Sequence, residues 1–80
     1  MIKNQYKDGE RDGYWEEYYT NGNVRYKGYY KDGKEHDLWE QYHSDGNIMF
    51  KGYYKDGELH GYWEFYWYFD EVMLYKEFYI

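Results

Sequence analysis

Two histidines are the first candidates for chemistry, because an imidazole can bind a metal ion or transfer a proton near neutral pH. His36 and His60 each follow an Asp-Gly pair by three residues and stand 24 residues apart. If each Asp-Gly pair joins two strands, two strand spacings separate the histidines, about 10 Å. One metal ion cannot bridge that distance without further ligands. We therefore interpret both histidines as turn residues and expect no metal site.

Three glutamates recur at the same spacing. Glu16, Glu40 and Glu64 would also stand about 10 Å apart, close to the carboxylate separation of inverting glycosidases, but lysines are expected to face each of them, which favours an ion-paired ladder. The single Ser44 follows His43 in a predicted turn, so we interpret both as turn residues. The sequence lacks a glycine-rich phosphate motif. We therefore expect no catalytic residue and no cofactor, and predict that the protein is not an enzyme.

The elements that position these residues form an internal repeat. Tyr-Lys-Asp-Gly occurs at 6–9, 30–33 and 54–57, and a Trp-Glu pair follows each copy at the same distance. A fixed period of this kind predicts an array whose units bury one another's faces. We divide the single domain, residues 1–80, into units of about 6–29, 30–53 and 54–80.

Each unit has two turn signals, Asp-Gly and Asn-Gly or Asp-Gly, separated by runs rich in Tyr, Trp, Phe, Val and Ile. This pattern is typical of β-hairpins. Because glycine recurs every ten to fourteen residues, a helical reading fails. We predict an all-β fold, a single antiparallel meander of about seven strands. They are expected near 2–7, 13–19, 24–31, 37–43, 48–55, 61–68 and 72–79.

The turns set a register. A two-residue turn at Asn21-Gly22 pairs Trp15 with Gly28 and Tyr19 with Val24, and a tight turn around Gly33-Lys34 brings Trp39 to the other side of Gly28. Each inner tryptophan is then expected to lie over a glycine on both flanks, since the missing side chain makes room for an indole. Trp39, with a repeat on either side, is predicted to be the most buried indole.

This register predicts two aromatic faces. The tryptophan face carries Trp15, Trp39, Trp63, Val24, Tyr26, Ile48, Phe50, Tyr30 and Tyr54. The tyrosine face carries Tyr14, Tyr18, Tyr29, Tyr42, Tyr53, Tyr62 and Tyr66 around a ladder of Glu and Lys. The tyrosines either stack as cross-strand pairs with wet hydroxyls or form an interface, which large exposed aromatic patches usually mark.

Composition limits the partners. Ten basic and sixteen acidic residues give a net charge of −6, which opposes direct binding to nucleic acid or to an anionic membrane. Glutamates between the lysines likewise argue against a stacking platform for single-stranded nucleic acid. The chain has no cysteine and its apolar runs are only a few residues long, so we expect neither disulfides nor a secretory or membrane-spanning segment. We expect a soluble protein in the cytoplasm, of the producing cell or of a virus-infected host.

Residues 30–48 (Tyr-Lys-Asp-Gly-Lys-Glu-His-Asp-Leu-Trp-Glu-Gln-Tyr-His-Ser-Asp-Gly-Asn-Ile) and 54–66 (Tyr-Lys-Asp-Gly-Glu-Leu-His-Gly-Tyr-Trp-Glu-Phe-Tyr) resemble MORN repeats. The variant form is the one common in bacterial and viral proteins and in antitoxin-like immunity proteins. The resemblance covers residues 6–66. It implies an elongated β-meander, protein–protein contacts, sometimes lipid contacts, and no shared catalytic residues.

Two surfaces are the candidate binding sites. One joins the tyrosine face to the apolar C-terminal hairpin, which adds Trp67 and Phe78 and which we expect to dock onto another chain rather than to cap the core. The other is an acidic edge of turn residues, able to imitate a phosphate backbone toward a basic partner: Asp8, Glu10, Asp12, Asp32, Glu35, Asp37, Asp56 and Glu58.

These surfaces predict a non-enzymatic protein-binding module, an acidic inhibitor or antitoxin-type protein that occupies a basic surface of a partner, such as a nucleic-acid-binding surface. A carbohydrate- or membrane-surface module is one alternative, although membrane binding is disfavoured. A structural, self-associating array, hence a homo-oligomer, is the other.

Overall fold

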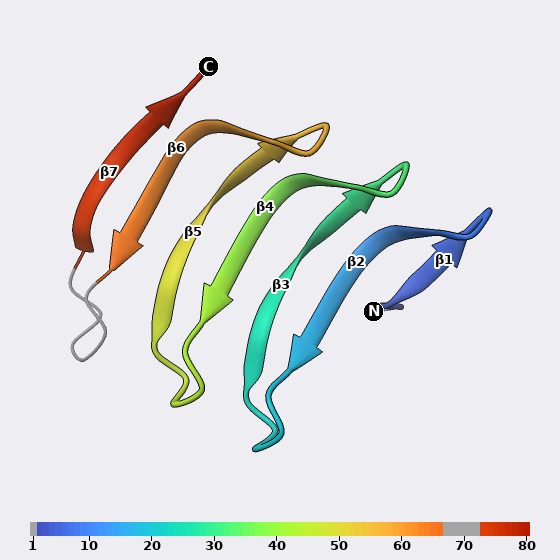
Figure 1. Cartoon of the computed structure of the whole chain (residues 1–80), viewed down its shortest axis with the longest axis horizontal. Coiled ribbons are helices and arrows are strands. Elements are labelled where there is room, and N and C mark those ends of the chain that lie inside the picture. Colours follow the sequence, from blue (N-terminus) through green and yellow to red (C-terminus); the bar gives the residue numbers. More distant parts are fainter. Residues whose placement is uncertain (1, 67–72) are drawn as a thin grey trace.

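The computed structural model describes residues 2–66 and 73–80. These residues form one open, seven-stranded antiparallel sheet in which every strand pairs with its neighbours in the sequence (Figure 1). The strands are β1 (Gln5–Lys7), β2 (Glu10–Tyr18), β3 (Val24–Lys31), β4 (Lys34–Tyr42), β5 (Ile48–Lys55), β6 (Glu58–Tyr66) and β7 (Met73–Tyr79). The predicted all-β meander is confirmed.

The predicted strand bounds hold for 24–31 and 48–55 and shift elsewhere. β2, β4 and β6 each begin three residues earlier than expected, because the Asp-Gly pairs alone make the turns. β1 is shorter than the predicted 2–7, since pairing starts only at Gln5. Residues 67, 68 and 72, which the prediction places in strands, lie outside the described residues.

The Asp-Gly turns correct the predicted turn around Gly33-Lys34. Asp32 and Gly33 have φ angles of 52° and 79°, the left-handed conformation that a type I′ hairpin turn requires. Lys31 therefore pairs with Lys34, and a β-bulge after Gly28 restores the expected pairing with Trp39. Asp37, in this bulge, has a φ of 62°. Glycine occupies the two equivalent positions of the other units, 13 and 61, also with positive φ.

The predicted two-residue turn at Asn21-Gly22 is wrong. Residues 19–23 separate the strands, and the Tyr19 amide donates a 2.8 Å hydrogen bond to the Asn23 carbonyl. Val24 therefore pairs with Tyr18, not Tyr19, across a second bulge, and Ile48 pairs with Tyr42 in the next unit. Because directly opposed residues share a face, Val24 and Ile48 belong to the tyrosine face, which corrects their predicted place on the tryptophan face.

The core lies on the tryptophan face. Tyr26, Trp39 and Trp63 form its buried cluster, and Tyr30, Phe50, Tyr54, Phe65 and Tyr79 pack against it. Trp63 is 1% exposed and Trp39 7%, so the prediction that Trp39 is the most buried indole is wrong. The reason is local: Trp63 touches Phe50, Tyr54 and Phe65, whereas a polar Gln41 stands at the position of Phe65 beside Trp39.

Each inner tryptophan covers one glycine. The indole of Trp39 is the group nearest to Gly28, and that of Trp63 the nearest to Gly52, so each indole lies over the glycine of the preceding strand. The register sets Trp39 opposite Gly28 and Gly52 on its two flanks, as expected, and its indole lies over Gly28. Trp39 donates a 3.1 Å hydrogen bond to the Tyr29 carbonyl and Trp63 a 2.8 Å bond to the Tyr53 carbonyl, which fixes the rings in place.

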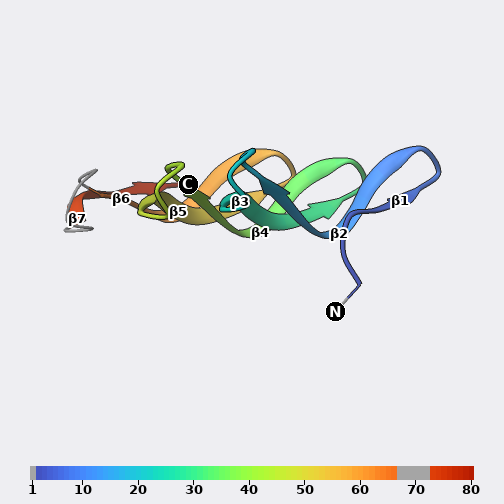
Figure 2. The same cartoon turned by 90° about the horizontal axis from the view of Figure 1, so that it is seen from below.

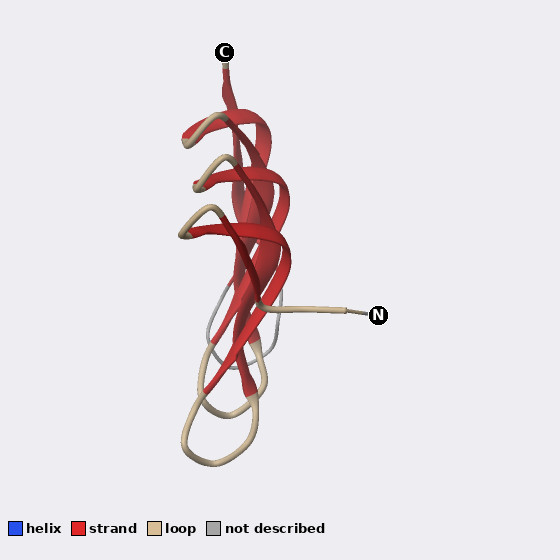
Figure 3. Cartoon of the chain, turned by 90° about the vertical axis from the view of Figure 1, so that its right-hand side faces the viewer, coloured by secondary structure: helices blue, strands red, loops and turns tan. Residues whose placement is uncertain are grey.

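The molecule is thin. Its principal extents are 40 × 36 × 17 Å, and the edge-on view in Figure 2 shows a single twisted layer rather than two packed sheets. Figure 3 shows the hairpin ends curling out of the mean plane at one end and wider loops at the other. The described residues contain no helix that could cross a membrane.

Candidate functional site

The tyrosine face is organised in rows that cross the strands. One row, which we call the apolar row, contains one residue from each of β2 to β7: Tyr14, Tyr29, Leu38, Tyr53, Tyr62 and Phe78. The register pairs Tyr14 with Tyr29, Leu38 with Tyr53 and Tyr62 with Phe78. Exposure rises along this row, from 36% at Tyr29 to 52% at Tyr53 and 59% at Phe78.

A charge ladder runs beside the apolar row, two residues away from it on each of β2 to β7. It consists of Lys3, Glu16, Lys27, Glu40, Lys51, Glu64 and Lys76. Lys27 lies 3.8 Å from Glu40, and Glu64 lies 3.7 Å from Lys51 and 3.8 Å from Lys76. The ladder that the sequence predicts is therefore present, although its glutamates are only 21–25% exposed.

A third row consists of Tyr18, Tyr42 and Tyr66, whose hydroxyls donate hydrogen bonds to the ladder glutamates Glu16, Glu40 and Glu64. The Tyr42 hydroxyl donates a 3.1 Å hydrogen bond to Glu40, and the Tyr66 hydroxyl donates a 2.7 Å bond to Glu64. Glu16 accepts bonds from Tyr14, Tyr18 and Lys3, which lower its pKa to about 2. In Glu16 and Glu64 the hydrogen bonds lower the pKa and so favour the charged form, which leaves these two carboxylates poorly suited to proton transfer.

Two grooves lie between the apolar row and the charge ladder. The larger, about 360 Å³, has Gly52 at its base and is lined by Leu38, Glu40, Lys51, Tyr53, Tyr62, Glu64 and Lys76. The smaller, about 260 Å³, has Gly28 at its base and is lined by Tyr14, Lys27, Tyr29, Leu38 and Glu40. Leu38 and Glu40 border both. The grooves are thus consecutive copies of one feature, repeated once per unit.

The predicted site residues divide into three groups. Tyr14, Tyr29, Tyr53, Tyr62 and Phe78 come together in the apolar row. Tyr18, Tyr42 and Tyr66 instead form the row that binds the glutamates. Trp67 lies outside the described residues.

Leu38 is the groove residue that sequence reasoning missed. It lines both grooves and is 37% exposed. Its position in the 24-residue repeat is that of Tyr14 and Tyr62. The 24-residue alignment is therefore the signal in the sequence that marks Leu38 as a residue of this row.

The predicted acidic edge carries both signs of charge. Its residues lie in or beside the three Asp-Gly turns, which line one edge of the sheet in Figure 1. Lysine or arginine alternates with the acids there, at Lys7, Arg11, Lys31, Lys34 and Lys55. Each turn therefore has only one more acid than base. Imitation of a phosphate backbone would need a more uniform field.

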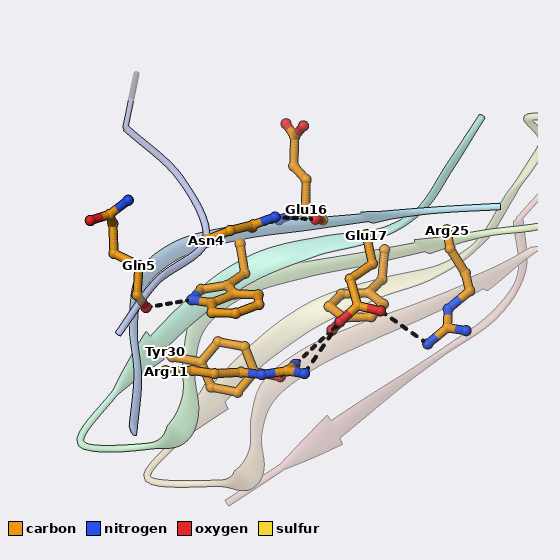
Figure 4. Close-up of polar contacts among 9 residues, drawn as sticks. Asn4, Gln5, Arg11, Glu16, Glu17, Arg25 and Tyr30 are labelled. Carbon is orange, nitrogen blue, oxygen red and sulfur yellow. Dashed lines mark hydrogen bonds and ion pairs between the residues drawn. The ribbon is translucent and has the colours of Figure 1, made fainter. Parts of the chain in front are cut away.

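On the tryptophan face of the first repeat, Arg11 joins β2 to β3 through a cluster of polar contacts (Figure 4). The Arg11 guanidinium lies 4.4 Å from the Trp15 ring centre, donates to the Tyr26 and Tyr30 hydroxyls and pairs with Glu17 at 3.3 Å. These groups satisfy one another. We therefore interpret this cluster as a structural cap and not as a site.

At the N-terminal edge of the sheet, a side chain replaces a strand. The side-chain amide of Asn4 donates a 3.0 Å hydrogen bond from Nδ2 to the backbone carbonyl of Glu16, and its Oδ1 accepts a 2.8 Å hydrogen bond from the backbone amide of Glu16 (Figure 4). Asn4 thereby satisfies backbone groups that a longer β1 would have paired.

The chemistry considered from the sequence finds little support in the geometry. No group of three His, Cys, Asp or Glu side chains in the part of the chain that the structure describes could hold a metal ion. Ser44 is exposed in a loop, where its carbonyl accepts bonds from Asn21 and Asn23 of the neighbouring loop. That contact joins adjacent units and is structural.

Comparison with protein-family models, with curated proteins and with solved structures found no match.

Proposed function

We propose that this protein is a non-enzymatic protein-binding module whose apolar row is the contact surface. The observation that carries the proposal is the exposure of that row. Five consecutive members, Tyr29, Leu38, Tyr53, Tyr62 and Phe78, are each 36–59% exposed on a face that no other described segment covers. A contiguous apolar patch of this kind usually marks an interface.

The net charge of −6 favours a partner with a basic surface. In this proposal the protein is an inhibitor or antitoxin-type protein that occupies that surface. We propose MORN repeats as the structural class, and the meander with its 24-residue sequence period supports that resemblance. Association with such a partner should weaken as salt is added, because screening shortens the reach of the acidic field.

Self-association through β7 is the second candidate, since the outer edge of this strand is unpaired within the described sheet. Two copies of β7 can pair antiparallel over all seven residues in only one register, which puts Lys76 opposite the Lys76 of the second copy. Like charges in direct opposition destabilise a strand pair. We therefore favour a different protein as the partner.

The test compares capture from an extract of the native host by three forms of the protein. They are the parent, Tyr53→Glu with Tyr62→Glu on the tyrosine face, and Tyr6→Glu, a 65% exposed tyrosine beside Trp15. The expected result is a stoichiometric partner held by the parent and by Tyr6→Glu and lost by the double variant. The same proteins on all three forms would contradict the proposal, and a dimeric mass for the isolated parent would favour self-association.

A further inference from the structure

The two grooves repeat with a spacing that limits what can lie in them. The smaller is centred on β3 and the larger on β5, and they share the Leu38 and Glu40 walls. Two strand spacings amount to about 9.6 Å. A ligand that makes the same contact in both grooves must therefore repeat itself at about that distance.

Of the regular peptide conformations, polyproline II fits this spacing best. It has three residues per turn and a rise of 3.1 Å, hence a repeat of about 9.3 Å. A β-strand presents the same side every two residues, about 6.7 Å. An α-helix, about 10–12 Å across with its side chains, is wider than the two-residue separation of the groove walls, about 6.7 Å.

The two groove walls match the two surfaces of such a peptide. Tyr29, Leu38, Tyr53 and Tyr62 offer apolar surface against which proline rings can pack, as in other aromatic grooves that bind proline-rich segments. On the opposite wall, Lys27, Lys51 and Lys76 lie 3.7–3.8 Å from their glutamates, beyond hydrogen-bond length. Their ammonium protons can reach the carbonyls of a polyproline II backbone, which makes no internal hydrogen bonds.

The charge around the grooves bears on which residues of a bound peptide would separate its prolines. Asp37 stands next to Leu38, and together with His36, Tyr53, Lys55 and His60 it lines a further pocket that adjoins the larger groove at Tyr53. The Asp37 carboxylate lies 3.8 Å from His36. Its side chain is 68% exposed, and its φ of 62° is one that glycine adopts at lower cost. Glycine stands at the equivalent positions 13 and 61. Asp37 is the acid of this pocket and Lys55 its lysine, so the preference for a basic ligand comes chiefly from the net charge of −6.

We infer, on the basis of the proposed protein-binding function, that the grooves of the tyrosine face bind a proline-rich, basic segment of the partner in polyproline II conformation. Prolines at every third residue occupy successive grooves, and an arginine or lysine between them lies near Asp37. The apolar row crosses five strand spacings, about 24 Å, so the segment spans about eight residues.

The test measures fluorescence anisotropy of the labelled nine-residue peptide (Pro-Pro-Arg)₃ with the full chain. The control peptide (Gly-Gly-Arg)₃ has the same length and charge without the polyproline II preference. We expect saturable binding of (Pro-Pro-Arg)₃ and at least tenfold weaker binding of (Gly-Gly-Arg)₃. Equal binding of the two peptides, or no saturable binding of (Pro-Pro-Arg)₃ by the parent, overturns the inference.

Variants locate the binding. Tyr53→Ser should weaken (Pro-Pro-Arg)₃ binding at least about tenfold, whereas Tyr6→Ser, on the other face, should leave it unchanged. Tyr62→Ser repeats the test at a second position, in case the first change disturbs folding. Unchanged binding by folded Tyr53→Ser and Tyr62→Ser overturns the assignment to the grooves.

Asp37→Gly restores the glycine of the other units and tests the charge. It should weaken (Pro-Pro-Arg)₃ and leave the uncharged (Pro-Pro-Gln)₃ unaffected, and an equal effect on both peptides overturns the role of Asp37. If no peptide binds while the tyrosine-face double variant still loses a captured protein, the polyproline II inference fails and the proposed function stands.

Discussion

The indole of Trp39 lies so close to Gly28 that a Cβ at position 28 would stand 2.5 Å from the ring atom Cδ2. Real Cβ atoms do not approach a neighbour so closely, and Trp39 is 7% exposed and has little room to move away. The pair also explains why glycine interrupts a strand that is otherwise rich in tyrosine and lysine.

Gly28→Ala should therefore destabilise the fold by about 1–3 kcal/mol, the usual cost of overpacking. Urea unfolding followed by tryptophan fluorescence measures the change. Lys55→Ala, at an exposed position of β5, is the control and should stay within about 0.5 kcal/mol of the parent. Equal stability of Gly28→Ala and the parent would contradict the packing described.

Trp63→Ala should be among the most damaging single changes. Trp63 is the largest fully buried side chain in the described residues, and its indole donates a hydrogen bond to the Tyr53 carbonyl. We expect a loss of about 3–5 kcal/mol, enough to unfold most of the molecules of a small domain. Loss of the cooperative thermal transition would be the signature. A melting temperature close to that of the parent would show that this core is dispensable.

The sequence predicts the sheet and the pairing of tryptophan with glycine because both depend on the repeat. A 24-residue period with two turn signals per unit leaves few ways to pair the strands. The match of Trp15 to Gly28 and of Trp39 to Gly52 follows from that period, and the structure confirms both pairs.

The bulges carry a signal that the predicted register did not use, since glycine stands at 13 and 61 with positive φ. The middle unit has Asp37 at that position, so its own residue type does not mark the bulge there. Asn21-Gly22 is a strong signal for a two-residue turn, but the bond from the Tyr19 amide to the Asn23 carbonyl makes a longer loop. A one-residue change of register moves side chains to the other face, which is why Val24 and Ile48 were misplaced.

The candidate site was predicted in outline. Period-two alternation places the tyrosines on one face, where the structure forms an apolar row and a row that binds glutamates, with Tyr14 taking part in both. That division depends on hydroxyl geometry, which residue spacing does not determine. The burial of Trp63 likewise depends on Phe65, an apolar residue where the preceding unit has Gln41.

At alkaline pH the tyrosine hydroxyls should limit stability. Burial, followed by the hydrogen bond to Glu64, raises the pKa of Tyr66 from 10.0 to about 12, and the pKa values of Tyr14 and Tyr26 are raised as well, chiefly by burial. In the unfolded chain these hydroxyls ionise near pH 10. The contribution of Tyr66 to stability is therefore complete below pH 10 and is lost as the pH rises through about 12, and Tyr14 and Tyr26 act in the same direction.

Tyrosinate absorbance and far-ultraviolet circular dichroism, recorded together against pH, check this expectation. A fraction of the tyrosines should ionise only above pH 10, together with the loss of strand signal. Ionisation of all fifteen tyrosines as one set near pH 10, with the sheet intact, would contradict the buried hydroxyl bonds.

At acid pH the critical group is Glu16. Hydrogen bonds from Tyr14, then Tyr18, then Lys3 lower its pKa from 4.5 to about 2. Because the folded-state pKa lies below the unfolded value, the stabilisation by Glu16 is present above pH 4.5 and is lost as the pH falls toward 2.

Glu16→Gln should therefore reduce the dependence of the unfolding free energy on pH between 5 and 2. Urea unfolding at several pH values measures that dependence, and Tyr14→Phe should reduce it in the same direction because it removes one of the three donors to Glu16. Tyr53→Phe, whose hydroxyl lies on another strand and does not bond Glu16, is the control and should follow the parent. If Glu16→Gln keeps the full pH dependence of the parent, the carboxylate bonds do not contribute to acid stability and other groups must account for it.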